Sequence, residues 1–117
     1  MVNVQERLAR TFKALADPTR RAILVQLERS DGASISELAE PFAIHLPAVM
    51  KHLDVLAKAG LITRSKAGRT VTVRLRTQPM REAMDWLQRY ERFWSSSLDK
   101  LTSYAESKEA EARKKSR

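Results

Sequence analysis

The segment between residues 45 and 76 changes its hydrophobic period once, and this change constrains the fold more than any other feature of the chain. Its first half, LPAVMKHLDVLAKAG, repeats apolar residues at helical spacing. Its second half, LITRSKAGRTVTVRL, alternates like a strand, a tight turn and a second strand. The segment therefore predicts a helix over 45–59, closed by Gly60, and a hairpin with strands over 61–66 and 70–76, in which Gly68 supplies a positive φ.

The same segment concentrates the positive charge of the chain. It holds seven of the 22 Lys and Arg residues and a single acid, Asp54, so it carries +6 of the formal net charge of +8. A helix followed by a basic hairpin suggests a recognition helix and a wing, and a local basic patch is typical of a surface that binds a polyanion. The alternative is a solvated basic face on an ordinary domain.

Three helices are predicted before residue 45. Apolar residues at helical spacing indicate the first, which ends before Asp17. Asp17 and Pro18 have the pattern of an N-cap and a first helical residue, so a second helix starts there. Ser34 and Glu37 have the spacing of a capping box for a short third helix through about residue 42. The residues expected on the inner faces, including that of helix 45–59, are Val4, Leu8, Phe12, Leu15, Ala22, Ile23, Val25, Leu27, Leu38, Phe42, Val49, Leu53 and Leu56.

A last long helix is predicted from residue 78, and it has two apolar faces. A terminal helix usually buries one face in its own domain, so the second, aromatic face is a candidate subunit interface. The alternative is a helix sunk deeply into its own core. The expected dimer interface comprises Leu8, Phe12, Trp86, Tyr90, Phe93, Trp94 and Leu98.

These elements predict a mainly α fold with a small β-hairpin, a winged helix-turn-helix with about five helices and a two-stranded wing in the order α-α-α-α-β-β-α. We expect one domain over residues 1–104 and a charged tail over 105–117 that is frayed or disordered. No apolar run approaches the roughly 20 residues of a membrane span, and the start lacks the apolar core of a secretory signal. The sequence therefore predicts a cytoplasmic protein without a membrane partner.

Several segments, taken in order, resemble the ArsR-type (arsenic-repressor-like, ArsR/SmtB) winged-helix transcriptional regulators. They are LADPTRRAIL at 15–24, ISELAEPFAI at 35–44, PAVMKHLDVLAKAGLI at 47–62, the GR pair at 68–69, and the terminal WL, Tyr90 and FW. The resemblance implies a homodimeric bacterial repressor. Such a protein binds an inverted repeat in double-stranded DNA, with helix 45–59 in the major groove and wing 61–76 on the flanking backbone or minor groove.

Candidate DNA contacts follow from this placement. The first residues of a recognition helix approach base edges, so base readout is expected from His45, Leu46, Pro47, Ala48 and Lys51. Phosphate contacts are expected from the wing, at Arg64, Lys66, Arg69 and Arg74. Strand alternation means that these wing side chains cannot all face one groove. Ser36 and His52 are further phosphate candidates, whose alternative roles are helix capping and a structural hydrogen bond.

The chain departs from the metal-sensing pattern of the family. It has no Cys, and its last predicted helix has no His, so no metal site and no cofactor are expected. The sequence does not decide whether an unidentified small-molecule effector binds the chain. The chain is not expected to be an enzyme, because it lacks a Cys nucleophile, a Gly-rich phosphate loop and a Ser beside His and an acid. The alternatives are a winged helix that docks an acidic protein partner, or a metal- or small-molecule-responsive sensor with an unrecognised site.

Overall fold

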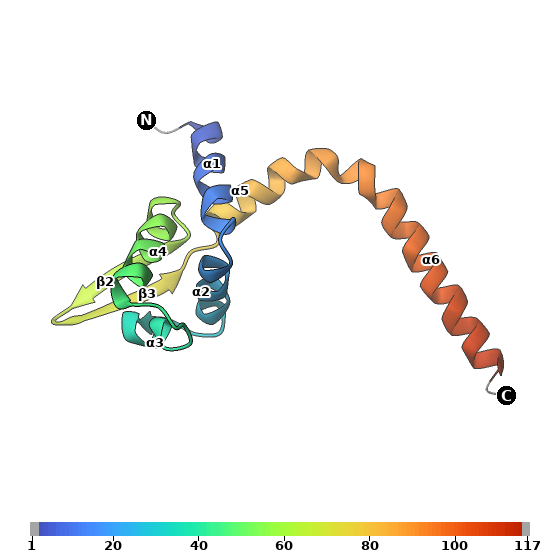
Figure 1. Cartoon of the computed structure of the whole chain (residues 1–117). Coiled ribbons are helices and arrows are strands. Elements are labelled where there is room, and N and C mark those ends of the chain that lie inside the picture. The colour runs from blue at the N-terminus through green and yellow to red at the C-terminus, as the bar shows by residue number, and fades with distance from the viewer. Residues whose placement is uncertain (1–2, 116–117) are drawn as a thin grey trace. The chain divides into compact units, whose positions relative to one another are not determined.

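The computed structural model describes residues 3–115, and for residues 96–98 and 115 it describes the backbone alone. The chain forms two compact units, one up to residue 84 and one from residue 85 (Figure 1). The first unit contains α1 (Val4–Leu15), α2 (Pro18–Glu28), β1 (Ala33–Ser34), α3 (Ile35–Ala39), α4 (Leu46–Lys58), β2 (Ile62–Ala67), β3 (Thr70–Leu75) and the start of α5 (Gln78–Leu87). This order confirms the predicted winged helix-turn-helix.

The junction of α1 and α2 is fixed by the residues that the sequence singled out. The carboxylate of Asp17 caps α2 by accepting a hydrogen bond of 3.0 Å from the backbone N–H of Arg20, and Pro18 occupies the first helical turn. That N–H holds the pKa of Asp17 below its usual value. The Arg20 guanidinium donates to the carbonyls of Lys13 and Ala14, both at 2.8 Å, so the end of α1 is satisfied as well.

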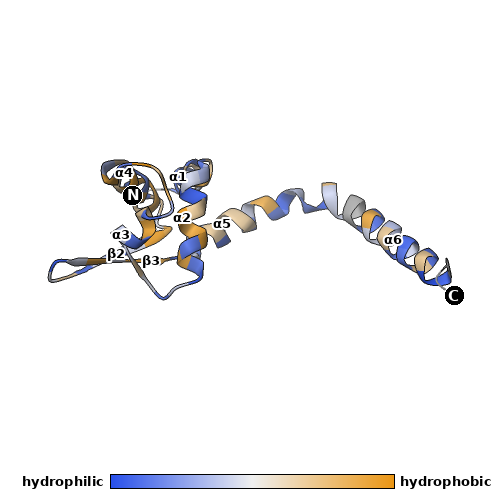
Figure 2. Cartoon of the chain, turned by 60° about the horizontal axis from the view of Figure 1, so that its bottom comes forward, coloured by the Kyte–Doolittle hydropathy of each residue, from blue (hydrophilic) through white to orange (hydrophobic). Residues whose placement is uncertain are grey.

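The core lies among α2, α3, α4 and the sheet. Figure 2 shows hydrophobic residues along α2 and α4 and hydrophilic residues at the tip of the β2–β3 hairpin. The predicted buried stripe of α4 is confirmed, because Val49, Leu53 and Leu56 are all 0% exposed. The other buried members of this cluster are Ala14, Ile23, Leu24, Leu27, Ala33, Leu38, Leu61, Ile62 and Val73.

Three residues expected on inner faces are instead exposed. Val4, Phe12 and Val25 are 49%, 37% and 42% exposed. In α1 the buried face runs through Thr11 and Ala14. A polar residue can occupy the inner face because the Thr11 hydroxyl donates 3.0 Å to the carbonyl of Arg7, which satisfies it locally.

The sheet has three strands in the order β1-β3-β2. Strands β2 and β3 form the expected two-stranded wing, and the sequence did not indicate the third strand, β1. The added strand β1 pairs Ala33 with Val73 and Ser34 with Thr72. Two residues are too few to give an alternating pattern, which is why the sequence did not indicate it. Gly32 leads into β1 with φ of 129°, and a Cβ there would lie 2.8 Å from the Thr72 side chain.

The β2–β3 hairpin projects away from the helices (Figure 1). Ala67 pairs with Thr70, so two residues form its turn, and the first of them, Gly68, has φ of 63° as predicted. The register pairs Arg64 with Val73 and Lys66 with Val71, while Arg74 pairs with Thr63. Arg64 and Lys66 therefore share one face of the hairpin, and Arg74 lies on the other.

The end of α4 is closed by Gly60, whose φ of 75° confirms the predicted left-handed cap. Its N–H donates to the Ala57 carbonyl, and the N–H of Leu61 donates to the Leu56 carbonyl, both at 3.0 Å. These two bonds form a Schellman motif, which turns the chain from α4 into β2.

The second unit contains the end of α5, a 3₁₀ turn at Gln88–Tyr90 (η1) and α6 (Glu91–Lys115). The expected single long helix is therefore interrupted. No Gly or Pro marks the interruption, and the apolar spacing continues through it, so the sequence carries no sign of it. The described side chains beyond residue 104 are exposed, and the boundary between domain and tail at 104/105 stays a prediction.

None of the helices in the described part of the chain is both long and apolar enough to cross a membrane.

Helix α3 begins with the predicted capping box. The Glu37 N–H donates 3.2 Å to the Ser34 hydroxyl, and the Ser34 N–H donates 3.0 Å to the Glu37 carboxylate. The second bond, together with the Ser34 hydroxyl, holds the pKa of Glu37 below its ordinary value of 4.5. The capping box thus favours the charged carboxylate in the folded chain.

We expect Glu37→Ala to lower the melting temperature at neutral pH and to lose this effect in acid. A depressed folded-state pKa contributes stability that is present above the unfolded pKa and is lost as the pH falls through the folded one. The difference in melting temperature between wild type and variant should shrink below about pH 4. Glu37→Gln is the control, because its amide oxygen still accepts from Ser34. A difference that stays constant with pH would contradict the role of the charge.

Candidate nucleic-acid interface

The start of α4 presents the predicted base-reading residues to solvent. His45, Leu46, Pro47 and Lys51 are exposed, Leu46 by 51%, and Ala48 is half-buried. The His45 side chain makes no capping hydrogen bond, and the first turn contains no acid. This end of the helix therefore offers donors, apolar groups and the positive end of the helix dipole together.

The single acid of the basic segment is paired with the wing. Asp54 on α4 accepts a hydrogen bond from Arg64 on β2, with Nη1 2.6 Å from Oδ1. The pair neutralises Asp54 and ties the hairpin to the helix. A phosphate would compete with Asp54 for Arg64, so Arg64 is less available for a DNA contact than the other basic residues of the wing.

A hollow of about 250 Å³ lies between the start of α3 and the tip of the wing. It brings together two predicted phosphate contacts, Ser36 and Arg69, although these are far apart in the sequence. Ser34 caps the helix, so the alternative capping role for Ser36 was wrong. The hollow adds the Thr70 hydroxyl, which the sequence analysis missed and which only its place beside the wing tip could have indicated. A guanidinium with neighbouring hydroxyls suits a phosphate.

The remaining wing bases lie apart from this hollow. Lys66 is exposed on the same hairpin face as Arg64. Arg74, on the opposite face, donates 3.1 Å to the carbonyl of Asp31 at the base of the sheet. The predicted wing contacts therefore divide between two faces, as strand alternation required.

The ring of His52 turns toward the start of α2. Its Nδ1 lies 3.3 Å from Nη1 of Arg20 and 3.9 Å from Oδ2 of Asp17. The alternative structural role is thus supported, and a phosphate contact through the other ring nitrogen stays a prediction.

Most of the expected dimer residues are accessible. Tyr90, Phe93 and Trp94 are 40%, 65% and 41% exposed, while Trp86 is half-buried. The rings of Trp86 and Tyr90 lie 5.3 Å apart and those of Tyr90 and Phe93 6.3 Å apart, so they form one aromatic stripe.

Two other members of the expected interface, Leu8 and Leu98, do not belong to this accessible set of side chains. Leu8 is 4% exposed in the single chain, so it presents little surface there, and its place in the interface stays a prediction. The side chain of Leu98 lies outside the described residues. Phe12 is 37% exposed and stays a predicted contact.

Within the described residues, no three His, Cys, Asp or Glu side chains come together as metal ligands would.

Comparisons with known proteins agree with this geometry. Residues 15–65 match a family described as a helix-turn-helix domain. The chain is 34% identical over 76 residues to the transcriptional repressor SdpR of Bacillus subtilis, covering 65% of this chain and 83% of SdpR. It is 36% identical over 97 residues to the regulator Rv2034 of Mycobacterium tuberculosis, covering 83% and 84%. The crystal structure of an ArsR family transcriptional regulator superposes with a TM-score of 0.73 at 42% identity, covering 82% of this chain and 98% of that one.

Proposed function

The chain belongs to the ArsR family of winged helix-turn-helix transcriptional regulators, and on this premise we propose that it is a homodimeric repressor of an inverted-repeat operator. The observation that carries the proposal is the exposed, acid-free start of α4 beside a basic hairpin. Helix α4 enters the major groove, and the hairpin contacts the flanking backbone. A regulator of this kind acts in the compartment that holds the DNA, the cytoplasm of a bacterium.

Base readout and backbone binding fall to different residues. Lys51 is long enough to donate to a guanine from the exposed face of α4, and Leu46 and Ala48 can contact a thymine methyl group. Arg69 and the hydroxyls of Ser36 and Thr70 bind a phosphate in the hollow beside α3. Because phosphate contacts release counterions, affinity falls steeply as salt rises.

The homodimer is supported by the exposed aromatic side chains of Tyr90, Phe93 and Trp94. Two copies related by a twofold axis place two α4 helices on successive major grooves, which matches an inverted repeat. Binding is metal-independent, since the chain has no Cys and both of its His residues lie at or in the helix that reads DNA.

The test is selection of sites from a random duplex library, with and without EDTA, followed by competition at fixed salt. Enrichment of an inverted repeat that chelation does not change is expected. A DNA reader should prefer its operator to random duplex by about 4 to 10 kcal/mol. Salt-sensitive binding without any enrichment would favour the rival function, a winged helix that docks an acidic protein.

We expect Lys51→Ala and Arg69→Ala to weaken DNA binding in different ways. Lys51→Ala should cost about 1 to 3 kcal/mol on the operator and relax the preference at one base position. Arg69→Ala should weaken operator and random duplex alike and lower the salt slope by about 1. Titrations on both duplexes at several salt concentrations measure this. Equal losses on the two duplexes for Lys51→Ala would remove it from base readout.

A further inference from the structure

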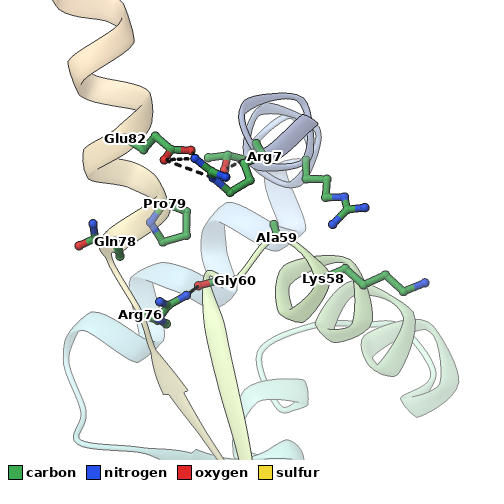
Figure 3. Close-up of a pocket in the computed structure, with 10 residues that line it drawn as sticks. Arg7, Lys58, Ala59, Gly60, Arg76, Gln78, Pro79 and Glu82 are labelled. Atoms are coloured by element: carbon green, nitrogen blue, oxygen red, sulfur yellow. Dashed lines mark hydrogen bonds and ion pairs between the residues drawn. The ribbon is translucent and has the colours of Figure 1, made fainter. Parts of the chain in front are cut away.

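A cleft of about 340 Å³ lies between α1, the end of α4 and the start of α5, away from the residues that are proposed to read DNA (Figure 3). Its walls carry four cationic side chains and one acid. The lining residues with charge are Arg7, Arg10, Lys58, Arg76 and Glu82. The excess of positive charge along this open cleft suits an anion.

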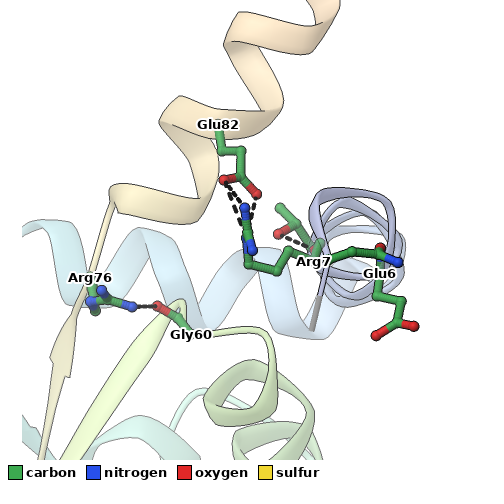
Figure 4. A network of polar contacts seen from close by, with 7 residues as sticks. Glu6, Arg7, Gly60, Arg76 and Glu82 are labelled. Atoms are coloured by element: carbon green, nitrogen blue, oxygen red, sulfur yellow. Dashed lines mark hydrogen bonds and ion pairs between the residues drawn. The ribbon is translucent and has the colours of Figure 1, made fainter. Parts of the chain in front are cut away.

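The one acid in the cleft is already neutralised. Nε of Arg7 lies 3.1 and 3.3 Å from the two carboxylate oxygens of Glu82, and Nη2 lies 3.2 Å from one of them. Figure 4 shows the two groups facing each other across the helices. The hydrogen bonds to Glu82 raise the pKa of Arg7. Because Glu82 is paired with Arg7, it does not neutralise the charges of Arg10, Lys58 and Arg76.

Those other cations have few partners of their own. Within the described residues, Arg10 and Lys58 form no ion pair, and Arg76 makes one long contact, 3.5 Å from Nη1 to the Gly60 carbonyl. A smaller hollow of about 190 Å³, lined by Arg10, Lys13, Val55 and Lys58, adjoins the cleft through Arg10 and Lys58. Arg10 and Lys58 thus line both hollows, and Figure 3 shows the Lys58 side chain directed away from Arg76.

The cleft also has an uncharged wall. Thr11, Ala59 and Pro79 line it, and Gly60 closes one side, since a Cβ there would lie 3.2 Å from Arg76 and 3.4 Å from Pro79. The hydroxyl of Thr11 is engaged with the Arg7 carbonyl, so its methyl group is left for packing. Cations facing apolar atoms suit an organic anion better than a bare ion.

We propose that this cleft binds a small organic oxyanion, a carboxylate or a phosphate, through Arg10 and Lys58 at one end, with Arg76 at the other end beside Gly60. Guanidinium groups present paired N–H donors that match both oxyanions, and the ammonium group of Lys58 adds a point charge. The site does not depend on the DNA proposal, because none of these three residues is among the predicted base or phosphate contacts.

The position of the cleft gives the anion a regulatory role, and this step rests on the proposed function. The lining joins the last turn of α4, the exit of β3 at Arg76 and the first turn of α5. An anion that links these segments fixes the angle between the reading helix and the wing. By thermodynamic linkage, operator binding then changes anion affinity by the same factor as the anion changes operator affinity.

The site is tested without DNA, by titrating the full chain with citrate and, separately, with inorganic phosphate. Backbone amide shifts of Thr11 and Gly60 in ¹⁵N correlation spectra are the readout. We expect saturable shifts at these amides and at least about tenfold weaker binding in Arg10→Gln/Lys58→Gln. Arg29→Gln/Lys114→Gln removes the same two positive charges from exposed positions outside the cleft and outside the proposed DNA contacts, and it should bind the anion as wild type does. Saturation by citrate alone assigns a carboxylate site, saturation by phosphate alone assigns a phosphate site, and saturation by both assigns a site that accepts either oxyanion.

Three results would overturn the site: shifts that do not saturate with either anion, equal weakening in the two double variants, or shifts confined to α4 residues 46–51 and the wing. Arg76→Gln is the second variant should Arg10→Gln/Lys58→Gln fail to fold, with the same tenfold expectation. Operator affinity measured with and without the bound anion then tests regulation alone. An unchanged affinity would overturn the regulatory step and leave the site standing, while loss of operator selection would count against the DNA proposal only.

Discussion

Replacing Leu53 with alanine is expected to lower the free energy of unfolding by about 2 to 5 kcal/mol, the largest stability effect of any single change considered for this chain. Leu53 is 0% exposed and lies in the middle of the buried stripe of α4. Its removal costs the transfer of its side chain and leaves a cavity among α2, α3 and α4. Small domains are commonly stable by only about 5 to 15 kcal/mol, so the variant approaches the unfolding threshold.

Denaturant unfolding followed by circular dichroism measures this effect, and Val25→Ala is the matched control. Val25 is also an apolar helical residue but is 42% exposed, so its truncation should cost less than about 1 kcal/mol. DNA binding by Leu53→Ala, measured where the variant is folded, should keep its sequence preference, because Leu53 is buried and is not among the proposed base contacts. If Leu53→Ala lowered the free energy of unfolding by no more than Val25→Ala does, α4 would not be packed on this core.

The buried stripe of α4 could be predicted because a helix that buries one face repeats apolar residues at helical spacing in the sequence. Val49, Leu53 and Leu56 recur at helical spacing, and Gly60 ends the pattern where the chain must reverse. The hairpin was predictable for the same reason, since its register follows from two alternating runs around Gly68. Local signals with a clear period therefore gave the winged helix-turn-helix.

The elements that the sequence did not predict show no such periodic pattern in their own residues. Strand β1 consists of two residues and exists only because β3 pairs with it. The turn at Gln88–Tyr90 interrupts a helix without a breaking residue. In α1 the hydrophobic pattern favoured Phe12, yet the buried position is that of Thr11, whose hydroxyl is satisfied by its own helix. These differences come from tertiary contacts that outweigh propensity.

The candidate site likewise has some features that could be predicted from the sequence and others that could not. Its charge and its location on α4 and the hairpin could be predicted from composition and period alone. The pairing of Asp54 with Arg64 and the hollow shared by Ser36 and Arg69 could not, because they depend on how the hairpin lies against α3 and α4. The cationic cleft is the extreme case, since its lining comes from α1, α4, the exit of β3 and α5.

The largest expected effect on DNA binding comes from Phe93→Glu, which should convert the proposed dimer into a monomer. Phe93 is 65% exposed, and its ring continues the stripe of Trp86 and Tyr90. Large aromatic side chains of this kind dominate protein interfaces, and a carboxylate buried at the twofold axis would face its own copy. Binding to an inverted repeat should weaken by about 10²- to 10⁴-fold, because the second half-site loses its effective concentration.

Sedimentation velocity gives the oligomeric state, and titrations on whole and half operators give the two affinities. Phe93→Glu should bind a half-site as well as wild type does, since the start of α4 and the wing are unchanged. Val25→Glu places the same charge on an exposed apolar residue of α2 and should remain a dimer with full affinity. A Phe93→Glu protein that stays dimeric would move the interface away from the aromatic stripe. A monomer that retains full affinity for the inverted repeat would mean that two copies bind independently, and the proposed coupling between symmetry and operator would be wrong.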